Sequence, residues 1–361
     1  MSREATTTIE QYLEEILGTI DFDSVNQFLN EHFRGKMTFE ALVSQVAKDG
    51  LSAIGAENVK TLLFDSLLYE ISTARPIFLK MLCFGMLFSI VQKLISTKNK
   101  YISDVGFLLI YGTIMALLMQ SFSLVKEIAM SGLEHLLQFL NALIPAYAVT
   151  LVFSGNAVTG GVFYEIAFFV IYLMELLMKN MLSPLIHVFV LVVFLNHLFE
   201  EDKLSKLAEL IELLVQMLLK MSFGIVAGLS VIQSILAPAK DRLADNVVLK
   251  GLSSLPGVGN MLGSAGEMVF SCGILIKNSI GVTALILVVI LAVVPVVKIG
   301  IVWLMYHLLS SVLQPIADNR ITECVSGVAR GCHLYMKMII NSMLLFFILF
   351  SVISAATTFA Y

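Results

Sequence analysis

From Pro76 onward the chain is a succession of apolar stretches, and this feature constrains its fold more than any other. A helix crosses the hydrocarbon core of a bilayer with about 20 consecutive apolar residues. The run 269–309 is too long for one span and contains Pro295, which predicts a short broken or re-entrant helix followed by a full span. The fold class is therefore all-α and polytopic, with about seven or eight membrane segments. The predicted segments are 77–95, 105–124, 133–153, 161–178, 181–199, 213–236, 269–309 and 334–359.

Composition points to the same environment. Hydrophobic residues make up 58% of the chain and charged residues 14%, against about 45–50% and about 25% in soluble domains. A chain of 361 residues cannot hide this excess in one core, so the excess must face lipid. The net charge of −4 is mild and no long charged tail is present, so nothing indicates a nucleic-acid partner.

Residues 1–75 are more polar and predict a small helical extramembrane domain in front of the multi-pass region 76–361. Apolar residues such as Val25 and Phe28 recur there at helical spacing, which predicts three or four short amphipathic helices. Thr38 is a predicted N-cap. These helices either pack together or lie on the membrane surface. The first residues lack the basic start and apolar core of a signal peptide, so either the first span starts insertion or a leader has been removed.

Lysines next to the predicted spans give an orientation. Lys93, Lys98 and Lys100 follow the first predicted span, and loops rich in Lys and Arg stay in the cytoplasm. The polar N-terminal domain is then expected on the extracytoplasmic side. Lys203 and Lys206 follow the fifth predicted segment and fit the same alternation.

Two stretches interrupt the pattern of spans and short loops. Residues 237–268 are irregular and rich in glycine and proline, whereas residues 310–333 contain Pro315 and mixed charges and predict an amphipathic segment. Irregular backbone survives at membrane depth only where protein covers it or where it lines water. We therefore expect both stretches to lie outside the membrane or to line a cavity within it.

Polar residues form stripes on three of the apolar helices. A carboxylate at bilayer depth costs at least about 2.5 kcal/mol, so such residues usually face protein or water. The stripe of the sixth segment is either the wet face of an interfacial helix or part of a polar interior. The other two stripes are either hydrogen-bonding glue between helices or the lining of a water-filled cavity. The stripes comprise Ser131, Glu134, Gln138, Asn141 and Pro145; Glu165, Tyr172, Glu175 and Lys179; and Ser205, Glu209, Glu212, Gln216 and Lys220.

Together the stripes predict a polar interior or pore lining shared by several helices. Its role would be to line or gate a hydrophilic path, or to hold subunits together. Because about eight helices enclose little open space, a wide path requires a homo-oligomer. The candidate polar residues are Glu134, Gln138, Asn141, Glu165, Glu175, Lys277 and Lys298, and the candidate helix-packing residues are Gly259, Gly263 and Pro295.

No catalytic or metal-binding pattern stands out in the sequence. It contains no HExxH, GxSxG or GxxxxGK[ST] motif. The six histidines are scattered, and the four cysteines match no zinc or redox spacing. We therefore expect no enzyme activity, no cofactor and no metal, with the cysteines acting as small buried apolar residues. An ATPase that supplies energy would be a separate chain.

Three blocks of the sequence resemble one known family. They are ALIPAYAVTLVFSGNAVTGGVFYE (142–165), LPGVGNMLGSAGEMVFSCGILIKNSIGV (255–282) and VVPVVKIGIVWLMYHLLSSVLQP (293–315). In order and spacing they resemble the stage III sporulation protein AE family over most of residues 60–361, whereas the N-terminal region resembles it only in character. Family members commonly begin with a cleavable signal sequence, which is absent here and which implies a processed or trimmed chain.

The resemblance implies a membrane component of a secretion-like channel complex in an endospore-forming bacterium, in the mother-cell membrane around the forespore. The implied partners are sister proteins of the same operon, including the separate ATPase, and a channel protein of the forespore membrane. Such a complex supports forespore development and late forespore transcription. No catalytic residue carries over from the family.

Two other functions stay open at this point. One is a secondary transporter with a polar site at the membrane midplane, for which Pro295 and the glycine-rich segment would supply the broken helices. The other is a non-conducting structural anchor that recruits sister channel proteins, with the polar stripes serving only as glue.

Overall fold

The computed structural model describes residues 17–33, 38–49, 79, 83, 100–153, 157–198, 203–253, 259–315 and 317–358. Almost all of them are helical, and no strand occurs in this part of the chain. The predicted span 77–95 lies outside the described residues, apart from two positions, as does the predicted domain boundary at residue 75.

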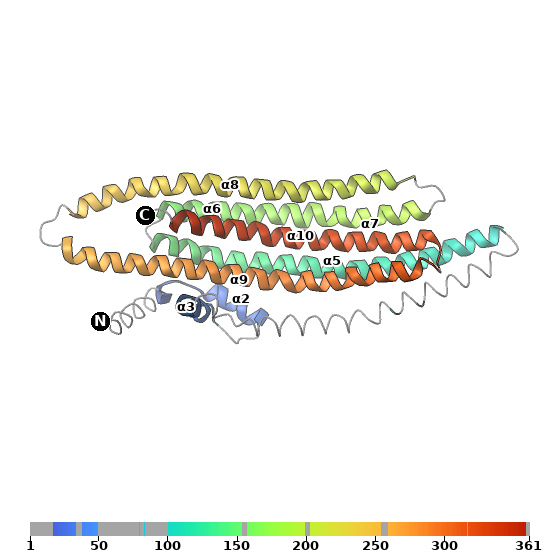
Figure 1. The fold of residues 1–361 in the computed structure, drawn as a ribbon, viewed down its shortest axis with the longest axis horizontal. Helices are drawn as coiled ribbons and strands as arrows, with labels where there is room; N and C mark the ends of the chain where they lie inside the picture. The colour runs from blue at the N-terminus through green and yellow to red at the C-terminus, as the bar shows by residue number, and fades with distance from the viewer. Residues whose placement is uncertain are drawn as a thin grey trace.

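Five long helical rods run side by side and alternate in direction (Figure 1). The second rod is continuous and comprises three labelled elements. One end of the bundle holds the connections from α7 to α8 and from α9 to α10, and we call it the α7–α8 end. The opposite end holds the connections from α5 to α6 and from α8 to α9, and we call it the α5–α6 end. The rods are α5 (Lys100–Phe153), α6 (Ala157–Met174) with η2 (Glu175–Leu182) and α7 (Ser183–Leu198), α8 (Ser205–Ser253), α9 (Gly259–Leu313) and α10 (Asn319–Thr358).

The predicted count of seven or eight membrane segments is not confirmed, because predicted neighbours are halves of single rods. The predicted spans 105–124 and 133–153 are both parts of α5, and 161–178 and 181–199 both belong to the second rod. The polar stretch between the first two keeps the helical period, with Val125, Ala129 and Leu133 all buried. Five helices of the described chain are long and apolar enough to cross a membrane.

The break predicted within 269–309 does not occur. Helix α9 passes through Pro295 without interruption, and the proline ring lies against Gly132 of α5. A Cβ atom at Gly132 would lie 2.7 Å from Pro295 Cγ, so the absence of a side chain there makes room for the ring.

The two stretches predicted to interrupt the spans also differ from expectation. Residues 237–253 complete α8 and 259–268 begin α9, leaving only 254–258 outside the described residues. A glycine inside a helix costs only about 0.5–1 kcal/mol, which a packed bundle tolerates. Between α9 and α10 the turn is confined to the few residues after Leu313, and the mixed charges of the predicted segment 310–333 lie on α10.

Hydroxyl groups join the rods inside an otherwise apolar core. The Tyr306 hydroxyl donates to Ser121 Oγ at 2.6 Å and thereby joins α9 to α5. The Tyr335 hydroxyl donates to the backbone oxygen of Ser183 at 3.1 Å and joins α10 to α7. Buried hydroxyls with partners stabilise one particular register of the helices, because an unpaired hydroxyl in such a core would be costly.

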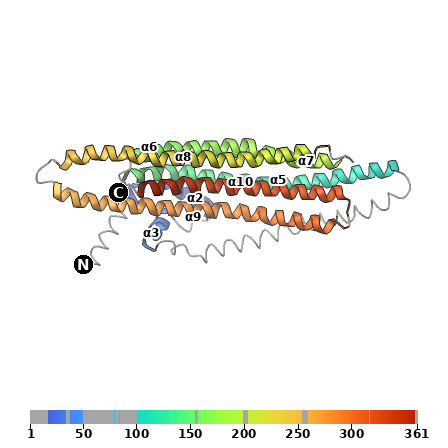
Figure 2. The same ribbon diagram turned by 45° about the horizontal axis from the view of Figure 1, so that its top comes forward.

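Two short helices, α2 (Asp23–Phe33) and α3 (Phe39–Asp49), lie against the flank of the bundle (Figure 2). Phe28 packs on Phe139 of α5 with ring centroids 5.6 Å apart, and α3 contacts α9. The two helices also contact each other, since Asn26 donates to Glu40 at 2.9 Å. The predicted N-cap is confirmed, because Thr38 Oγ1 accepts a hydrogen bond from the Ala41 backbone. Of the two sequence alternatives, the structure has these helices packed together and on the bundle.

Candidate functional site

The rods are longer than a bilayer is thick. Helix α5 has 54 residues, which at 1.5 Å per residue is about 80 Å. The hydrocarbon core of a bilayer is about 30 Å thick. A single bilayer therefore covers about half of each rod or less.

Side-chain contacts fix which residues of neighbouring rods lie at the same level. Tyr111 of α5 contacts Cys324 of α10 at 2.9 Å, across a separation of 213 residues. Eleven residues further along each helix, the rings of Phe122 and Tyr335 are 5.6 Å apart, again across a separation of 213 residues. Helices α5 and α10 are thus parallel and in constant register. The contacts of Gly132 with Pro295 and of Ser121 with Tyr306 fix α9 antiparallel to α5 in the same way.

This register brings one lysine from every rod to the middle of the bundle. Measured along the bundle axis, the positions of these five lysines differ by about five residues, which is roughly 8 Å. None of the five side chains is fully buried, and Lys179 donates to Glu134 at 2.8 Å on the outer surface. We call this set the lysine belt. It consists of Lys126 on α5, Lys179 on η2, Lys220 on α8, Lys298 on α9 and Lys337 on α10.

Between the lysine belt and the α7–α8 end, three rods are free of charged residues. These stretches are 105–125 of α5, 180–198 of η2 and α7, and 299–315 of α9 and the turn after it. Large apolar side chains point outward there, including Leu109 at 70% exposure and Leu304 at 60%. This surface is apolar enough to face lipid. The half on the other side of the lysine belt is also apolar, because 135–153 of α5, 221–239 of α8, 278–297 of α9 and 338–358 of α10 contain no charged residue.

The charged residues of this half gather where α8 and α10 face each other. The guanidinium of Arg330 lies 3.7 Å from the Glu212 carboxylate, and Gln216 donates to that carboxylate at 3.4 Å. Asn341 donates to Ser222 at 2.8 Å just past the lysine belt. We call this row the α8–α10 seam. It comprises Glu209, Glu212, Gln216 and Ser222 of α8 with Glu323, Arg330, His333 and Asn341 of α10.

The α8–α10 seam is half-exposed along the side of the bundle and is not enclosed by it. The side chains of Glu212 and Arg330 are 26% and 41% exposed. At the α7–α8 end the seam opens into a cavity of about 430 Å³. The polar stripe predicted on the sixth segment is therefore one wall of the seam. Its other wall, on α10, begins in the stretch 310–333, which the sequence predicts as an amphipathic segment outside the membrane or lining a cavity.

Most of the other predicted polar residues lie on the outer surface of the bundle. Glu134, Gln138 and Asn141 form an exposed row on α5, and Glu165 and Glu175 are exposed on the second rod. None of these five lines the interior of a single chain. Whether they line a path formed between chains stays a prediction.

The two predicted lysines differ in their surroundings. Lys277 is fully buried in α9, whereas Lys298 is half-buried and belongs to the lysine belt. Of the predicted packing residues, Pro295 contacts Gly132, and the side-chain surroundings of Gly259 and Gly263 lie outside the described part.

A pair of glycines that sequence reasoning missed holds α10 against its neighbours. A Cβ atom at Gly327 would clash with Val193 Cγ1, and one at Gly331 would lie 2.6 Å from Val190 Cγ2. The small-xxx-small spacing of the two glycines was the available signal.

No three His, Cys, Asp or Glu side chains come together as a metal site in the described part of the chain.

The family model described as stage III sporulation protein AE matches residues 37–357. The stage III sporulation protein AE of Bacillus subtilis (strain 168) is 22% identical over 360 residues, covering 96% of this chain and 89% of the relative. No solved structure matches the chain. Because the family model covers far more than half of its length, the chain belongs to the stage III sporulation protein AE family, which implies a role in sporulation.

Proposed function

We propose that this chain is the membrane component of a secretion-like channel complex between mother cell and forespore, and that its α8–α10 seam forms one wall of a hydrophilic path. The observation that carries the proposal is the row of charged and polar side chains that runs along an otherwise lipid-like half of the bundle. Ionisable residues at membrane depth usually face a water-filled cavity or another protein and pair with one another.

We propose that the bilayer surrounds the half of the bundle between the lysine belt and the α7–α8 end. This half is about 20 residues long in α5, and 20 residues of helix span about 30 Å. Charged residues bound it on both sides, with the lysine belt at one level and Lys100, Lys203 and Asp318 near the α7–α8 end.

The N-terminal helices favour the same placement. Helix α2 lies against α5 at His135 and Phe139, which are beyond the lysine belt on the side of the α5–α6 end. It carries Asp23 and Glu31 on its exposed face. Carboxylates facing hydrocarbon would be costly, so this half of the bundle stands outside the membrane together with α2 and α3.

The positive-inside rule gives the orientation. Lys203 lies in the connection from α7 to α8 and Lys100 at the start of α5, whereas the lysines of the belt lie inside the rods and not in loops. We therefore propose that the α7–α8 end lies in the cytoplasm of the mother cell. The opposite half, with the N-terminal helices, then projects into the intermembrane space. There it meets sister proteins of the complex and a partner from the forespore membrane, while the separate ATPase acts from the cytoplasm.

One chain supplies only one wall of such a path. The core of the bundle is apolar, and the seam faces sideways. The opposite wall comes from a second copy or from a sister protein. The exposed residues Glu134, Gln138, Asn141, Glu165 and Glu175 are then candidates for the part of the path outside the bilayer.

A structural anchor is the second candidate function. The buried tyrosine contacts and the glycine pair of α10 indicate a rigid bundle. The transporter alternative has less support, because α9 runs unbroken through Pro295 and supplies no half-helix ends for a midplane site.

Cysteine accessibility separates a path from an anchor. Single cysteines replace Gln216 in the seam and Leu213 on the outer apolar face of the same helix, in a background without the native cysteines. In the assembled complex, a membrane-impermeant thiol reagent is expected to modify position 216 and not position 213. Equal protection of both positions, together with protection at 134, 138, 165 and 175, would refute the path and leave the anchor.

A further inference from the structure

The cavity at the α7–α8 end has both signs of charge in its wall. Its volume is about 430 Å³, and α7, α8 and α10 line it. Arg320, Glu323 and Arg330 come from α10 and Glu209 from α8. The residues of α10 are spaced by three and seven positions, which places them along one side of the helix.

The two arginines are held in place with most of their donors unused. The Arg320 guanidinium lies 4.0 Å from the centre of the Phe107 ring, and that of Arg330 lies 5.4 Å from the Phe189 ring. Stacking on aromatic rings orients a guanidinium without using its N–H groups.

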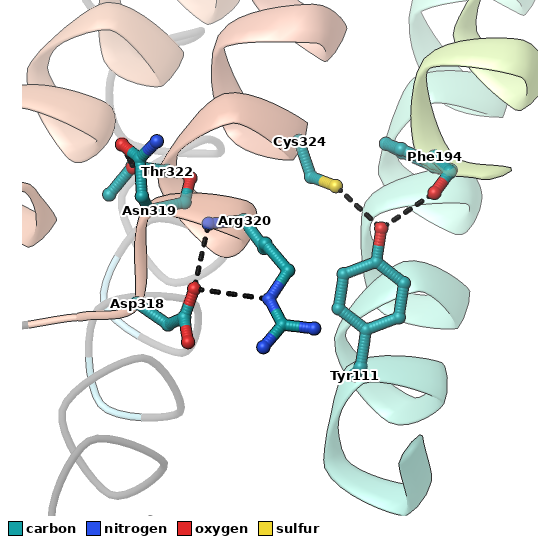
Figure 3. Close-up of polar contacts among 7 residues, drawn as sticks. All are labelled: Tyr111, Phe194, Asp318, Asn319, Arg320, Thr322 and Cys324. Atoms are coloured by element: carbon teal, nitrogen blue, oxygen red, sulfur yellow. Dashed lines mark hydrogen bonds and ion pairs between the residues drawn. The ribbon is translucent and has the colours of Figure 1, made fainter. Parts of the chain in front are cut away.

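The acidic neighbours of these arginines are beyond hydrogen-bonding distance. Asp318 Oδ1 is 3.5 Å from Arg320 Nε, and Glu212 Oε2 is 3.7 Å from Arg330 Nη1. Hydrogen bonds between N–H and oxygen have lengths of about 2.7–3.2 Å. Among the described residues, neither guanidinium therefore makes a side-chain hydrogen bond of ordinary length. Figure 3 shows Arg320 and Asp318 at the start of α10.

The carboxylates of the cavity differ from each other. Glu209 accepts a hydrogen bond from Lys206 at 2.8 Å and is thereby neutralised. Glu323 is exposed and forms no hydrogen bond or ion pair with any residue that the structure describes. The cavity thus offers two cations rich in free donors and one carboxylate free to accept.

A rigid frame keeps these groups in place. The Tyr111 hydroxyl of α5 donates to the backbone oxygen of Phe194 in α7 at 2.7 Å and contacts Cys324 of α10 at 2.9 Å, as Figure 3 shows. This buried junction fixes α10 beside α7, so the cavity is preformed.

Exposed leucines are adjacent in sequence to residues that line the cavity. Leu195 of α7 and Leu207 and Leu210 of α8 are 43%, 43% and 51% exposed, on the same two helices that line it. These leucines offer contacts to an alkyl chain, which a free phosphate ion would not use.

We propose that this cavity binds the headgroup of an aminophospholipid. Arg320 binds the phosphate, because a guanidinium group matches phosphate oxygens. Arg330 lies ten residues further along α10, which is about 15 Å along the helix axis, and adds its positive charge to the cavity wall. Glu323 accepts from the ammonium group, and the neighbouring leucines contact the acyl chains. The proposal is independent of any hydrophilic path, since a lipid site serves an anchor equally well.

The test uses the purified full chain and three soluble probes. These are short-chain phosphatidylethanolamine, short-chain phosphatidylglycerol and inorganic phosphate, each titrated by calorimetry. The ethanolamine lipid is expected to bind most tightly, and Arg320→Gln to weaken it at least about tenfold, more than Arg330→Gln does. Glu323→Gln is expected to remove the preference over phosphatidylglycerol, and Lys220→Gln, outside the cavity, to preserve it.

Several results would overturn the proposal. Binding of inorganic phosphate as tight as that of the lipid would assign the site to a free anion. Equal binding of the two lipids by the unchanged chain would exclude a role for Glu323 in recognition, and absence of binding would exclude the site. Thermal unfolding of each variant is measured in parallel. If an arginine variant does not fold, the exposed Glu323→Gln variant decides alone, and an unchanged preference in it refutes the proposal.

Discussion

Adding a single methyl group at Gly331 tests the packing of α10 most sharply. A Cβ atom there would lie 2.6 Å from Val190 Cγ2 and 2.8 Å from Phe122 Cε2. Both neighbours are fully buried, and valine has little rotational freedom, so neither can move aside. Helix α10 must therefore shift away from α5 and α7 to accommodate alanine.

The expected loss of stability follows from two opposing effects. Overpacking of a tight core typically costs about 1–3 kcal/mol. Replacing glycine by alanine inside a helix returns about 1 kcal/mol. The upper part of the overpacking range applies because two rigid neighbours clash at once, so Gly331→Ala is expected to lose about 1–2 kcal/mol in the free energy of unfolding.

The chain supplies a matched control. Gly224 of α8 is exposed and has nothing within 4 Å of an added Cβ atom. Gly224→Ala should therefore gain up to about 1 kcal/mol from helix propensity alone. Unfolding of both variants in detergent, followed by circular dichroism, should show shifts of opposite sign. If Gly331→Ala is as stable as Gly224→Ala, the close approach of α10 to its neighbours is wrong.

Three further predictions concern the core, the surface and the lysine belt. Tyr306→Phe removes the hydrogen bond to Ser121 and should cost about 1 kcal/mol in thermal unfolding; no change would mean that the two rods are not in this register. Glu134→Gln removes an exposed ion pair with Lys179 and should change unfolding by less than about 1 kcal/mol; a larger loss would show that the pair holds the bundle together. Trp303, the single tryptophan, lies about one turn from the lysine belt. Lipids brominated near the headgroup should therefore quench its fluorescence more than lipids brominated near the chain ends. The reverse order would place the belt inside the bilayer.

The helical class and the apolar character of the rods follow directly from the sequence, but the number of rods does not. Lys126 and Glu127 look like part of a loop between two spans in a hydropathy profile. The buried series Val125, Ala129 and Leu133 shows that the same stretch keeps the helical period. A fixed window of about 20 residues divides such a rod in two because it assumes that every apolar helix ends at the membrane surface.

The candidate site was only half predictable. The stripe on α8 is visible as a run of polar residues at steps of three and four. Arg330 and His333 belong to the predicted amphipathic stretch 310–333, and nothing in the sequence pairs that stretch with α8. The lysine belt cannot be predicted from the sequence of any single helix. Lysines such as Lys126 and Lys337 come to one level only when the register of the rods is known.

The central claim is that the bilayer covers the half of the bundle next to the α7–α8 end. Leu109 and Val152 lie on the same helix, α5, on opposite sides of the lysine belt, and are 70% and 51% exposed. Each is replaced by cysteine in a cysteine-free chain, reconstituted alone in nanodiscs so that both membrane faces meet the solvent. The account predicts that a water-soluble maleimide modifies position 152 and leaves position 109 unmodified. Modification of 109 with protection of 152 would contradict it.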